Sequence, residues 1–402
     1  MKILVVANKP PYPPVDGGTL ATLNLCMGLA KAGNNVAVLA LSTPKHLGSI
    51  DRIPFEVRSY ITFDFFHIHL SSSTFKNLLN LTFTRKPYNV QRYYSTGFKR
   101  LLTRTLRDKD FDVVQLEGLY LVPYIGTIRK AFNGKLVMRA HNIENHIWEN
   151  LARDEESKIR QWYFKVLARR LASIENNINK KVDALVAISN PDREWFLGHG
   201  FVKPSIAIPA GYFPGNQASD VEKSDNPSVC YIGALDWLPN TEGLLWFLDW
   251  VWPRIQSEIP NVEIHIAGRN APEEFAERLM MERSIIFHGQ VANSAEFLGK
   301  FSVMIVPLLS GSGIRVKIIE GMFLKHAIVS TSMAAKGIDA NHGEHILIAD
   351  TPEEFAKAVC SLIKLPEMAG RIAQNAQTFA LENYDAVNLA SKLTGFYKEI
   401  SQ

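Results

Sequence analysis

Residues able to bind a phosphorylated ligand gather in one short segment of this 402-residue chain. An apolar run at Val303–Val306 ends at a proline, and a glycine-rich turn, two cations and a carboxylate follow it: Gly311, Ser312, Gly313, Ile314, Arg315, Lys317 and Glu320. Backbone N–H groups at a helix N-terminus, together with cations, attract phosphate. Because Glu320 would repel phosphate, we expect it to accept hydrogen bonds from ligand hydroxyls such as those of a ribose. The segment therefore predicts a nucleotide-sugar site.

Three other strand ends in the second half of the chain carry residues suited to the same ligand. The pairs are Gly233 with Asp236, Gly268 with Arg269, and Gly289 with Gln290, after strands expected at 229–232, 262–267 and 285–288. An arginine between a strand and a helix is well placed to bind a diphosphate through bidentate bonds. The alternative for Arg269 is a surface ion pair with Glu273 or Glu274. Backbone groups near Gly289 and Gln290 can read a nucleobase.

A pair of glycines, Gly17 and Gly18, follows the first expected strand and opens a helix. Paired glycines let a ligand approach the backbone of a helix N-terminus, although a plain tight turn explains them equally well. The spacing is not G-x-G-x-x-G, and no acidic residue closes the second strand. The fingerprint of a dinucleotide-dependent oxidoreductase is therefore missing.

Polar residues cluster at and after the strand expected at 135–139, namely Arg139, His141, Asn142 and Glu144. Residues at the carboxyl end of a parallel strand face the ligand-binding edge of a sheet. His141 can bind a sugar hydroxyl or act as acid or base, and the alternative is a loop histidine satisfied by backbone groups. No His-Glu-x-x-His spacing is present, and the Asp-x-Asp of RDKDFD precedes its strand, so we expect no metal and no cofactor.

Short apolar runs alternate with helical segments along the whole chain. This pattern predicts an α/β fold with two tandem, Rossmann-like, doubly wound domains that face each other across a cleft. We expect the first domain over 1–208, a linker rich in Pro, Gly and Ser over 209–227, and the second domain over 228–384. An amphipathic helix over 385–402 can cross back to the first domain.

Composition indicates a globular chain with an uneven charge distribution. Hydrophobic residues make up 47% and charged residues 21%, and the first apolar run, KILVVA, is too short for a signal peptide. Residues 1–205 hold 29 Lys and Arg against 17 Asp and Glu, whereas the remainder holds 15 against 23, which sums to the net charge of +4. The basic half favours an anionic partner such as a membrane surface, or simply solvated helix faces; nucleic acid is disfavoured. Three scattered cysteines fit a reducing cytoplasm.

The motifs GSGIRVKIIEGM, HIAGRN and RAHNIE resemble those of the GT-B glycosyltransferases, within them the retaining family 4 enzymes, and more narrowly a bacterial exopolysaccharide and surface-glycan branch. The resemblance covers nearly the whole chain. It implies that the second domain binds a nucleoside-diphosphate sugar and that the first binds a glycan or polyprenyl-diphosphate-linked acceptor, with Arg139, Asn142 and Glu144 on the acceptor side. The sparse cysteines and the basic first domain further predict a cytoplasmic enzyme that can contact the inner membrane face peripherally.

Individual residues match the family pattern unevenly. Glu320 matches the second carboxylate of the Glu-x7-Glu motif, which binds the donor ribose, but Ser312 stands where the first carboxylate would be. The usual basic residue is missing from ALDWLPN, which leaves Arg269, Arg315 and Lys317 as candidates for the diphosphate. His141 matches a histidine near the donor sugar, and Gly17 and Gly18 match the loop near the phosphates.

Two alternatives remain open beside a transferase. A nucleotide-sugar 2-epimerase shares the architecture but needs acid and base carboxylates, and the loss of the first motif carboxylate counts against it. A catalytically silent nucleotide-sugar-binding subunit is compatible with Ser312.

Overall fold

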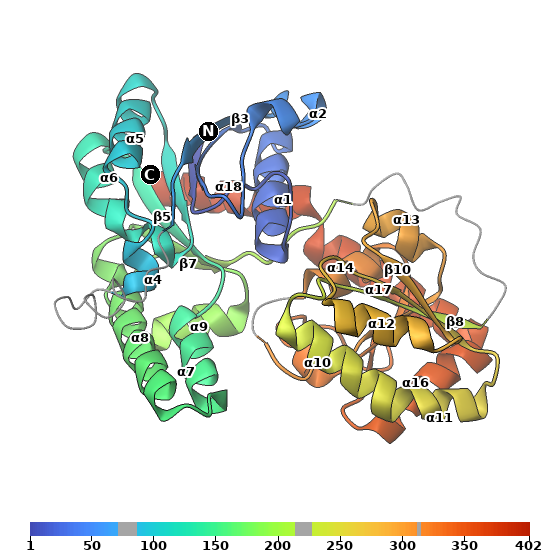
Figure 1. The fold of residues 1–402 in the computed structure, drawn as a ribbon. Coiled ribbons are helices and arrows are strands. Elements are labelled where there is room, and N and C mark those ends of the chain that lie inside the picture. The colour runs from blue at the N-terminus through green and yellow to red at the C-terminus, as the bar shows by residue number, and fades with distance from the viewer. Residues whose placement is uncertain (71–86, 214–226, 312–314) are drawn as a thin grey trace. The chain divides into compact units, whose positions relative to one another are not determined.

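The computed structural model describes residues 1–70, 87–213, 227–311 and 315–402. They form two compact units (Figure 1). Unit 1 comprises Met1–Gly211 together with Ala386–Gln402, and unit 2 comprises Tyr212–Asp385. Each unit contains one parallel β-sheet with helices on both faces, so the prediction of two doubly wound α/β domains is confirmed.

Unit 1 is built on a seven-stranded sheet with the order β3-β2-β1-β4-β5-β6-β7. Its strands are β1 (Lys2–Ala7), β2 (Asn35–Ser42), β3 (Ile61–His67), β4 (Val113–Glu117), β5 (Lys135–Ala140), β6 (Ala184–Ala187) and β7 (Ser205–Ala207). The order reverses between β1 and β4, which is where a doubly wound sheet opens a crevice at its carboxyl edge.

The helices of unit 1 connect these parallel strands. They are α1 (Gly17–Lys31), α2 (Phe55–Arg58), α4 (Tyr88–Gln91), α5 (Thr96–Asp108), α6 (Ile125–Ala131), α7 (Glu144–Asp154), α8 (Lys158–Asn176), α9 (Asn190–Gly198) and α18 (Ala386–Ser401), with short 3-10 turns at Ile50–Arg52, Leu119–Tyr124 and Ile178–Lys180. Successive side chains of a strand point to opposite faces. Ile3 and Val5 accordingly pack with α1 and α18, whereas Leu4 and Val6 pack with α5 and α6.

The C-terminal helix α18 belongs to unit 1 although it follows unit 2 in the sequence. Figure 1 shows it beside α1, and its Leu393 and Tyr397 are fully buried. The close approach of the two helices depends on Gly28 of α1, because a Cβ there would collide with the carbonyl oxygen of Ala386.

Unit 2 contains a six-stranded parallel sheet with the order β10-β9-β8-β11-β12-β13. Its strands are β8 (Ser228–Ile232), β9 (Glu263–Ala267), β10 (Ile285–Gly289), β11 (Val303–Val306), β12 (Ala327–Ser330) and β13 (Leu347–Ile348). Its helices are α10 (Leu238–Trp246), α11 (Trp252–Glu258), α12 (Glu273–Met281), α13 (Ser294–Gly299), α14 (Val316–Phe323), α15 (Ser332–Ala335), α16 (Pro352–Lys364) and α17 (Pro366–Tyr384), and a π-turn at Phe247–Val251 joins α10 to α11.

Both faces of the unit 2 sheet are covered. Val303 and Ile305 of β11 pack in one apolar cluster with α10, α11 and α16, while Met304 and Val306 pack in the other with α13, α14 and α17. Burial on both faces explains why this strand is a continuous apolar run. The next helix, α14, carries the predicted residues Lys317 and Glu320 and begins at Val316, whereas β11 ends at Val306.

We predict that Gly28→Ala will destabilise unit 1 by about 1–3 kcal/mol, because the added methyl forces α18 away from α1. Gly395→Ala on α18 is the matched control. Gly395 is exposed and nothing lies within 4 Å of a Cβ built there, so this change should be neutral or stabilise the helix by up to about 1 kcal/mol. Urea unfolding of both variants measures the difference; equal stability of the two would contradict the packing argument.

Candidate functional site

In unit 2 the predicted glycines lie at the carboxyl ends of the neighbouring strands β8, β9 and β10. The N–H of Gly233 donates to the carbonyl of Ala267 at 3.1 Å, and that of Gly268 donates to the carbonyl of Gly289 at 2.8 Å. Gly289 has φ of +62°, which glycine adopts without strain. A Cβ at Gly268 would lie 2.5 Å from the carbonyl oxygen of Gly233. The three turns therefore pack against one another through backbone hydrogen bonds.

The turn after β8 carries two exposed side chains, Asp236 and Trp237. Asp236 accepts a hydrogen bond from Asn270 at 3.1 Å. The guanidinium of Arg315 lies 5.6 Å from the ring centroid of Trp237, and a Cβ at Gly311 would press against both. Burial lowers the pKa of Arg315 to about 10, which leaves it charged at neutral pH. Ser312, Gly313 and Ile314 lie outside the described residues.

Lys317 points from the first turn of α14 toward the turn after β8. Its Nζ donates to Asn240 Oδ1 at 3.0 Å and lies 4.7 Å from the ring centroid of Tyr231. A Cβ built on Gly233 would lie 2.9 Å from this Nζ, so only glycine leaves the amine its place. Burial, and then the neighbouring Arg315, lower the pKa of Lys317 to about 7. In the part of the chain that the structure describes, this amine forms no ion pair.

Glu320 lies one turn further along α14, on the same face as Lys317. It is 9% exposed, and its Oε1 accepts from Ser294 at 2.6 Å and from Tyr212 at 3.3 Å. Burial raises the pKa of Glu320, while these two hydrogen bonds oppose the rise. Its Oε2 accepts no hydrogen bond from the described residues and can accept one from a ligand hydroxyl.

Arg269 and Gln290 occupy the turns after β9 and β10, as predicted from the strand ends. Arg269 is half-buried, and Gln290 is exposed. Within the described part of the chain Arg269 forms no ion pair, so the alternative of a surface pair with Glu273 or Glu274 is wrong. The structure places Arg269 beside Gly268, within the cluster of glycine turns.

In unit 1 the predicted His141 is bonded to a residue that the sequence analysis missed, Glu117 at the end of β4. His141 Nε2 lies 2.6 Å from Glu117 Oε2, and Arg139 Nη1 donates to the same oxygen at 3.0 Å. Burial acts to raise the pKa of Glu117, but the Arg139 guanidinium and His141 outweigh it and hold the pKa at about 2. The charged glutamate that ends the buried strand VVQLE, directly before Gly118, was the signal in the sequence.

Arg139 does not face an acceptor, contrary to the expectation from its place near a strand end. Its side chain is 0% exposed and forms an ion pair with Glu117 of the adjacent strand. Arg139 lies one residue before the end of β5 and points into the interior, where a buried cation needs a carboxylate partner. Its contribution to the site is therefore indirect, through Glu117 and His141.

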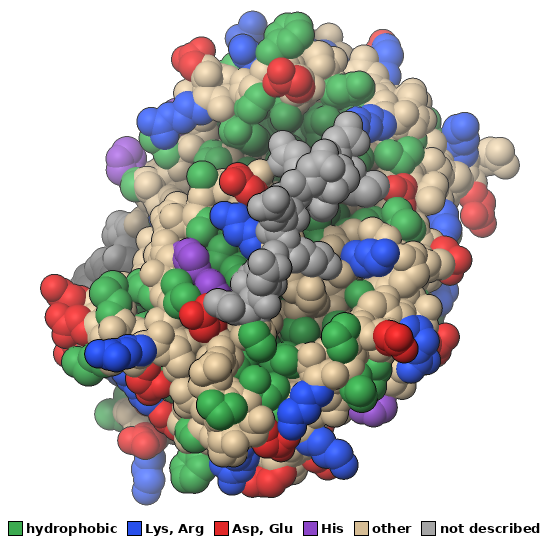
Figure 2. Space-filling model, turned by 90° about the vertical axis from the view of Figure 1, so that its right-hand side faces the viewer, with side chains coloured by type: hydrophobic (Ala, Val, Ile, Leu, Met, Phe, Trp, Pro, Cys, Tyr) green, Lys and Arg blue, Asp and Glu red, His purple; other side chains and the backbone are tan. Residues whose placement is uncertain are grey.

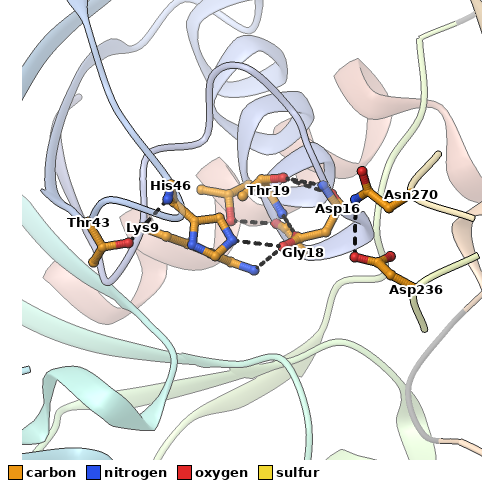
Figure 3. Close-up of polar contacts among 9 residues, drawn as sticks. Lys9, Asp16, Gly18, Thr19, Thr43, His46, Asp236 and Asn270 are labelled. Atoms are coloured by element: carbon orange, nitrogen blue, oxygen red, sulfur yellow. Dashed lines mark hydrogen bonds and ion pairs between the residues drawn. The ribbon is translucent and has the colours of Figure 1, made fainter. Parts of the chain in front are cut away.

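The loop before α1 carries the predicted Gly17 and Gly18 and is fixed by a capping box. Asp16 Oδ1 accepts from the N–H of Thr19 at 2.8 Å, and the Thr19 hydroxyl accepts from the N–H of Asp16 at 2.9 Å (Figure 3). Asp16 Oδ2 also accepts from Lys9 at 2.6 Å, and His46 lies 3.7 Å away. Burial opposes the effect of His46 and Lys9, which together lower the pKa of Asp16.

Thr22 links this loop to the Glu117 network. Its hydroxyl lies 3.0 Å from the carbonyl oxygen of Gly18 and 3.1 Å from Glu117 Oε2. Gly18 and His141, 123 positions apart in the sequence, are thereby connected through two side chains. The structure thus brings together the two features of the first domain that the sequence analysis singled out separately.

Asn142 and Glu144 follow His141 at the start of α7. Glu144 is buried and accepts from the Tyr120 hydroxyl at 2.7 Å, and burial raises its pKa. The N–H of Glu144 donates to Glu175 of α8 at 2.7 Å, and Asn145 donates to Glu175 through its side-chain amide at 2.6 Å. Through these bonds Glu175 anchors the helix that follows His141.

A small cavity of ≈ 10 Å³, about the size of one water molecule, lies beside these groups and is lined by His141, Asn142, Glu144 and Glu175.

Metal binding finds no support in the described residues. They contain no group of three or more His, Cys, Asp or Glu side chains arranged to hold an ion. The absence of a metal requirement stays a prediction.

Glu175 gives unit 1 a pH-dependent stability. Burial raises its pKa from 4.5 to about 7, so between these values the unfolded chain releases a proton that the folded chain keeps. The free energy of unfolding should fall by about 3 kcal/mol as the pH rises through this window. Glu175→Gln should remove this part of the fall. Chemical unfolding of both proteins between pH 4.5 and 8 measures it, and parallel profiles would contradict the assignment.

Comparisons with known proteins agree with this arrangement. A family model described as "Glycosyltransferase Family 4" matches residues 15–212, and one described as "Glycosyl transferases group 1" matches residues 226–365. A Klebsiella pneumoniae relative, described as an uncharacterized 44.6 kDa protein in the cps region, is 28% identical and is covered over 98% of both chains.

Solved structures share the fold over the full length at low sequence identity. Sucrose-phosphate synthase from Thermosynechococcus elongatus has a TM-score of 0.71 at 15% identity, with 100% of this chain and 99% of that chain covered. HepE of Anabaena, solved with UDP and glucose, has a TM-score of 0.68 at 14% identity, with 98% and 99% covered. With one glycosyltransferase model on each unit and this fold throughout, the chain belongs to the GT-B glycosyltransferases.

Proposed function

We propose that this glycosyltransferase moves a hexose from a nucleoside-diphosphate sugar to a glycan or polyprenyl-diphosphate-linked acceptor, with retention at the anomeric carbon. Unit 2 binds the donor, and unit 1 binds the acceptor. The observation that carries the proposal is the pair Lys317 and Glu320, a buried amine and a buried carboxylate on one face of α14. Lys317 stands directly beside the glycine turn that follows β8, since its Nζ lies 2.9 Å from a Cβ built on Gly233. The HepE structures that hold UDP, UDP-glucose, or UDP and glucose support a donor of this class.

Lys317 takes over a task that the family assigns to a cation in the loop after β8. That loop contains no Lys or Arg, and Asn240, in the first turn of α10, orients Lys317 by accepting its hydrogen bond. An amine with a pKa near 7 regains its full charge when a diphosphate arrives, since the anion favours the protonated form. Arg315 and Arg269 supply further positive charge from neighbouring turns.

In this proposal the protein positions the two substrates and stabilises the charge that develops on the departing diphosphate. The acceptor attacks from the face on which the diphosphate leaves, and the diphosphate itself takes the acceptor's proton. Lys317 and Arg269 then matter more for turnover than for donor affinity. Glu320 accepts from the ribose hydroxyls and so orients the donor.

A catalytically silent nucleotide-sugar-binding subunit is the second candidate, favoured by Ser312 at the first motif position. The two candidates differ in one measurable property. An enzyme of this class hydrolyses its donor slowly without an acceptor, whereas a silent subunit only binds it.

We predict that nucleoside diphosphates will raise the melting temperature of the protein by several degrees at saturation, because they bind the native state. Lys317→Met should lose only part of this shift but lower donor hydrolysis by a larger factor, on the order of 100-fold. Lys357→Met, on an exposed face of α16, is the matched control and should behave as the unaltered protein. A thermal-shift screen followed by hydrolysis of UDP-glucose and related donors makes the test. Full binding and hydrolysis in Lys317→Met would refute the assignment of the diphosphate site.

We further propose that unit 1 contacts an anionic membrane through one face of α8. Lys158, Trp162, Lys165 and Arg169 recur at helical spacing and are all exposed, with Trp162 at 59% exposure. In the described part of the chain these three cations have no carboxylate within 4.0 Å, although Glu155 and Glu156 precede the helix. By contrast, basic and acidic side chains are interspersed on the face in Figure 2. Tryptophan flanked by cations is typical of contact with anionic headgroups.

No helix among the described residues is long and apolar enough to span a bilayer. Contact through α8 would therefore be peripheral for this part of the chain.

We predict that the protein will co-sediment with vesicles containing phosphatidylglycerol at low salt and will be released by high salt. Lys158→Glu/Lys165→Glu/Arg169→Glu should lower the bound fraction at least tenfold. The matched control, Lys99→Glu/Arg100→Glu/Arg107→Glu, makes the same charge change on exposed residues of α5. An equal loss in both triple variants would show that net charge, and not the α8 face, governs binding.

A further inference from the structure

We propose that Glu117 is a positioning residue that fixes the tautomer of His141, so that His141 offers the lone pair of Nδ1 to a substrate hydroxyl. This inference rests on the proposed function for the identity of the substrate, a sugar. It assigns to the ring of His141 one defined role, that of hydrogen-bond acceptor.

The first step is the charge state of Glu117. Its Oε2 receives Arg139 Nη1 at 3.0 Å and faces the Thr22 hydroxyl at 3.1 Å, and its Oε1 receives the side-chain amide of Gln115. Donors thus face both oxygens, one of them on a guanidinium that is 0% exposed. A buried guanidinium requires an ionised partner. Glu117 is therefore a carboxylate, and its low pKa agrees with this.

The second step follows from hydrogen-bond chemistry. An ionised carboxylate has no proton and only accepts. The contact of 2.6 Å between Glu117 Oε2 and His141 Nε2 therefore requires a proton on Nε2. A neutral imidazole carries one proton, so Nδ1 is left as an acceptor.

The third step is access. Only 2% of the Glu117 side chain is exposed, whereas 22% of the His141 side chain is. Nδ1 of His141 forms no hydrogen bond with the described residues, so it is the ring nitrogen that a ligand can reach. With Nε2 committed to Glu117, the ring cannot donate to a ligand unless it becomes an imidazolium.

The fourth step is rigidity. Glu117 is held by residues from different elements: Thr22 on α1, Gln115 on β4 and Arg139 on β5. Gln115 in turn accepts a hydrogen bond from Tyr397 on α18. The carboxylate cannot turn away from His141 without breaking several of these bonds, so the orientation of the ring is set before a substrate binds.

Long-range ¹⁵N NMR of the free protein tests the tautomer without any substrate. We expect His141, assigned by its loss in His141→Gln, to show a protonated Nε2 and an unprotonated Nδ1. A ring protonated on Nδ1 would overturn the inference, whatever the outcome of the donor assays. The readout is therefore independent of the proposed function.

Two matched double variants test the role of Glu117. Glu117→Met/Arg139→Met replaces the buried ion pair with apolar groups of similar size and removes the acceptor for Nε2. Glu117→Gln/Arg139→Met removes the same charges but keeps an acceptor oxygen. We expect the first variant to lose the tautomer preference and about tenfold in kcat with little change in donor KM, and the second to keep the preference and lose less.

The same NMR signature in both variants would overturn the role of Glu117. The two double variants could instead lose kcat equally and lose melting temperature in parallel. That result would mean that Glu117 only supports the fold, and it would also overturn the positioning role. If the first variant does not fold, the ¹⁵N NMR signal of His141 in the unaltered protein and in the second variant still decides. An imidazole ring protonated on Nδ1 in either protein refutes the inference.

Discussion

The ion pair between Glu117 and Arg139 is the interaction on which unit 1 depends most. Both side chains are almost entirely buried, and removal of one partner from a buried pair typically costs about 3–5 kcal/mol because the other charge is left uncompensated. This pair also connects elements that have little else in common. Through Thr22 it reaches the glycine loop before α1, through Gln115 it reaches α18, and through His141 it reaches the surface. The charged groups at the strand ends are thus held by the interior of the sheet.

Unit 2 buries two charged side chains, Lys317 and Glu320, without pairing them as Glu117 and Arg139 are paired in unit 1. Among the described residues neither Lys317 nor Glu320 forms an ion pair, and burial shifts the pKa of each toward the neutral form. Polar neighbours such as Asn240 and Ser294 orient the two side chains without neutralising them. Burial makes the charged forms of both side chains unfavourable. A ligand with an anionic group and hydroxyl groups can offset this cost by bonding to Lys317 and Glu320. The contrast separates a charge pair that maintains a fold from two charged side chains that we propose bind the donor.

Much of the fold could be predicted from the sequence because parallel strands buried on both faces are short apolar runs. The segment from β11 to α14 is the best case, since the sequence predicted both the apolar strand and the helix that carries Lys317 and Glu320. The role of Arg139 could not be predicted in this way. Its partner lies 22 residues earlier, and whether a side chain near a strand end points inward depends on that partner. The same limit hid Glu117, because a glutamate after an apolar run also fits a solvated turn.

Two helices, α7 and α17, were also not predicted from the sequence. The sequence analysis assigned no element to Glu144–Asp154, but these residues form α7, whose first N–H groups are capped by Glu175 of α8. Such a cap is a contact between segments and leaves no local pattern. The stretch at 366–384, which forms α17, was likewise not assigned. Its alanine-rich buried face carries little of the hydrophobic contrast that marks an amphipathic helix.

The position of α18 has a consequence for how the protein is made. Leu393 and Tyr397 complete an apolar face of unit 1, yet the ribosome synthesises them after all of unit 2. While unit 2 emerges, the face of unit 1 formed by α1, β1 and β2 stays open to water, and Gln115 lacks the tyrosine that bonds it. Unit 2 is made from one continuous stretch and can fold first, although it lies second in the chain. Unit 1 is therefore completed only after unit 2 has been synthesised. A polypeptide truncated before residue 386 would leave one apolar face of the unit 1 sheet exposed to water.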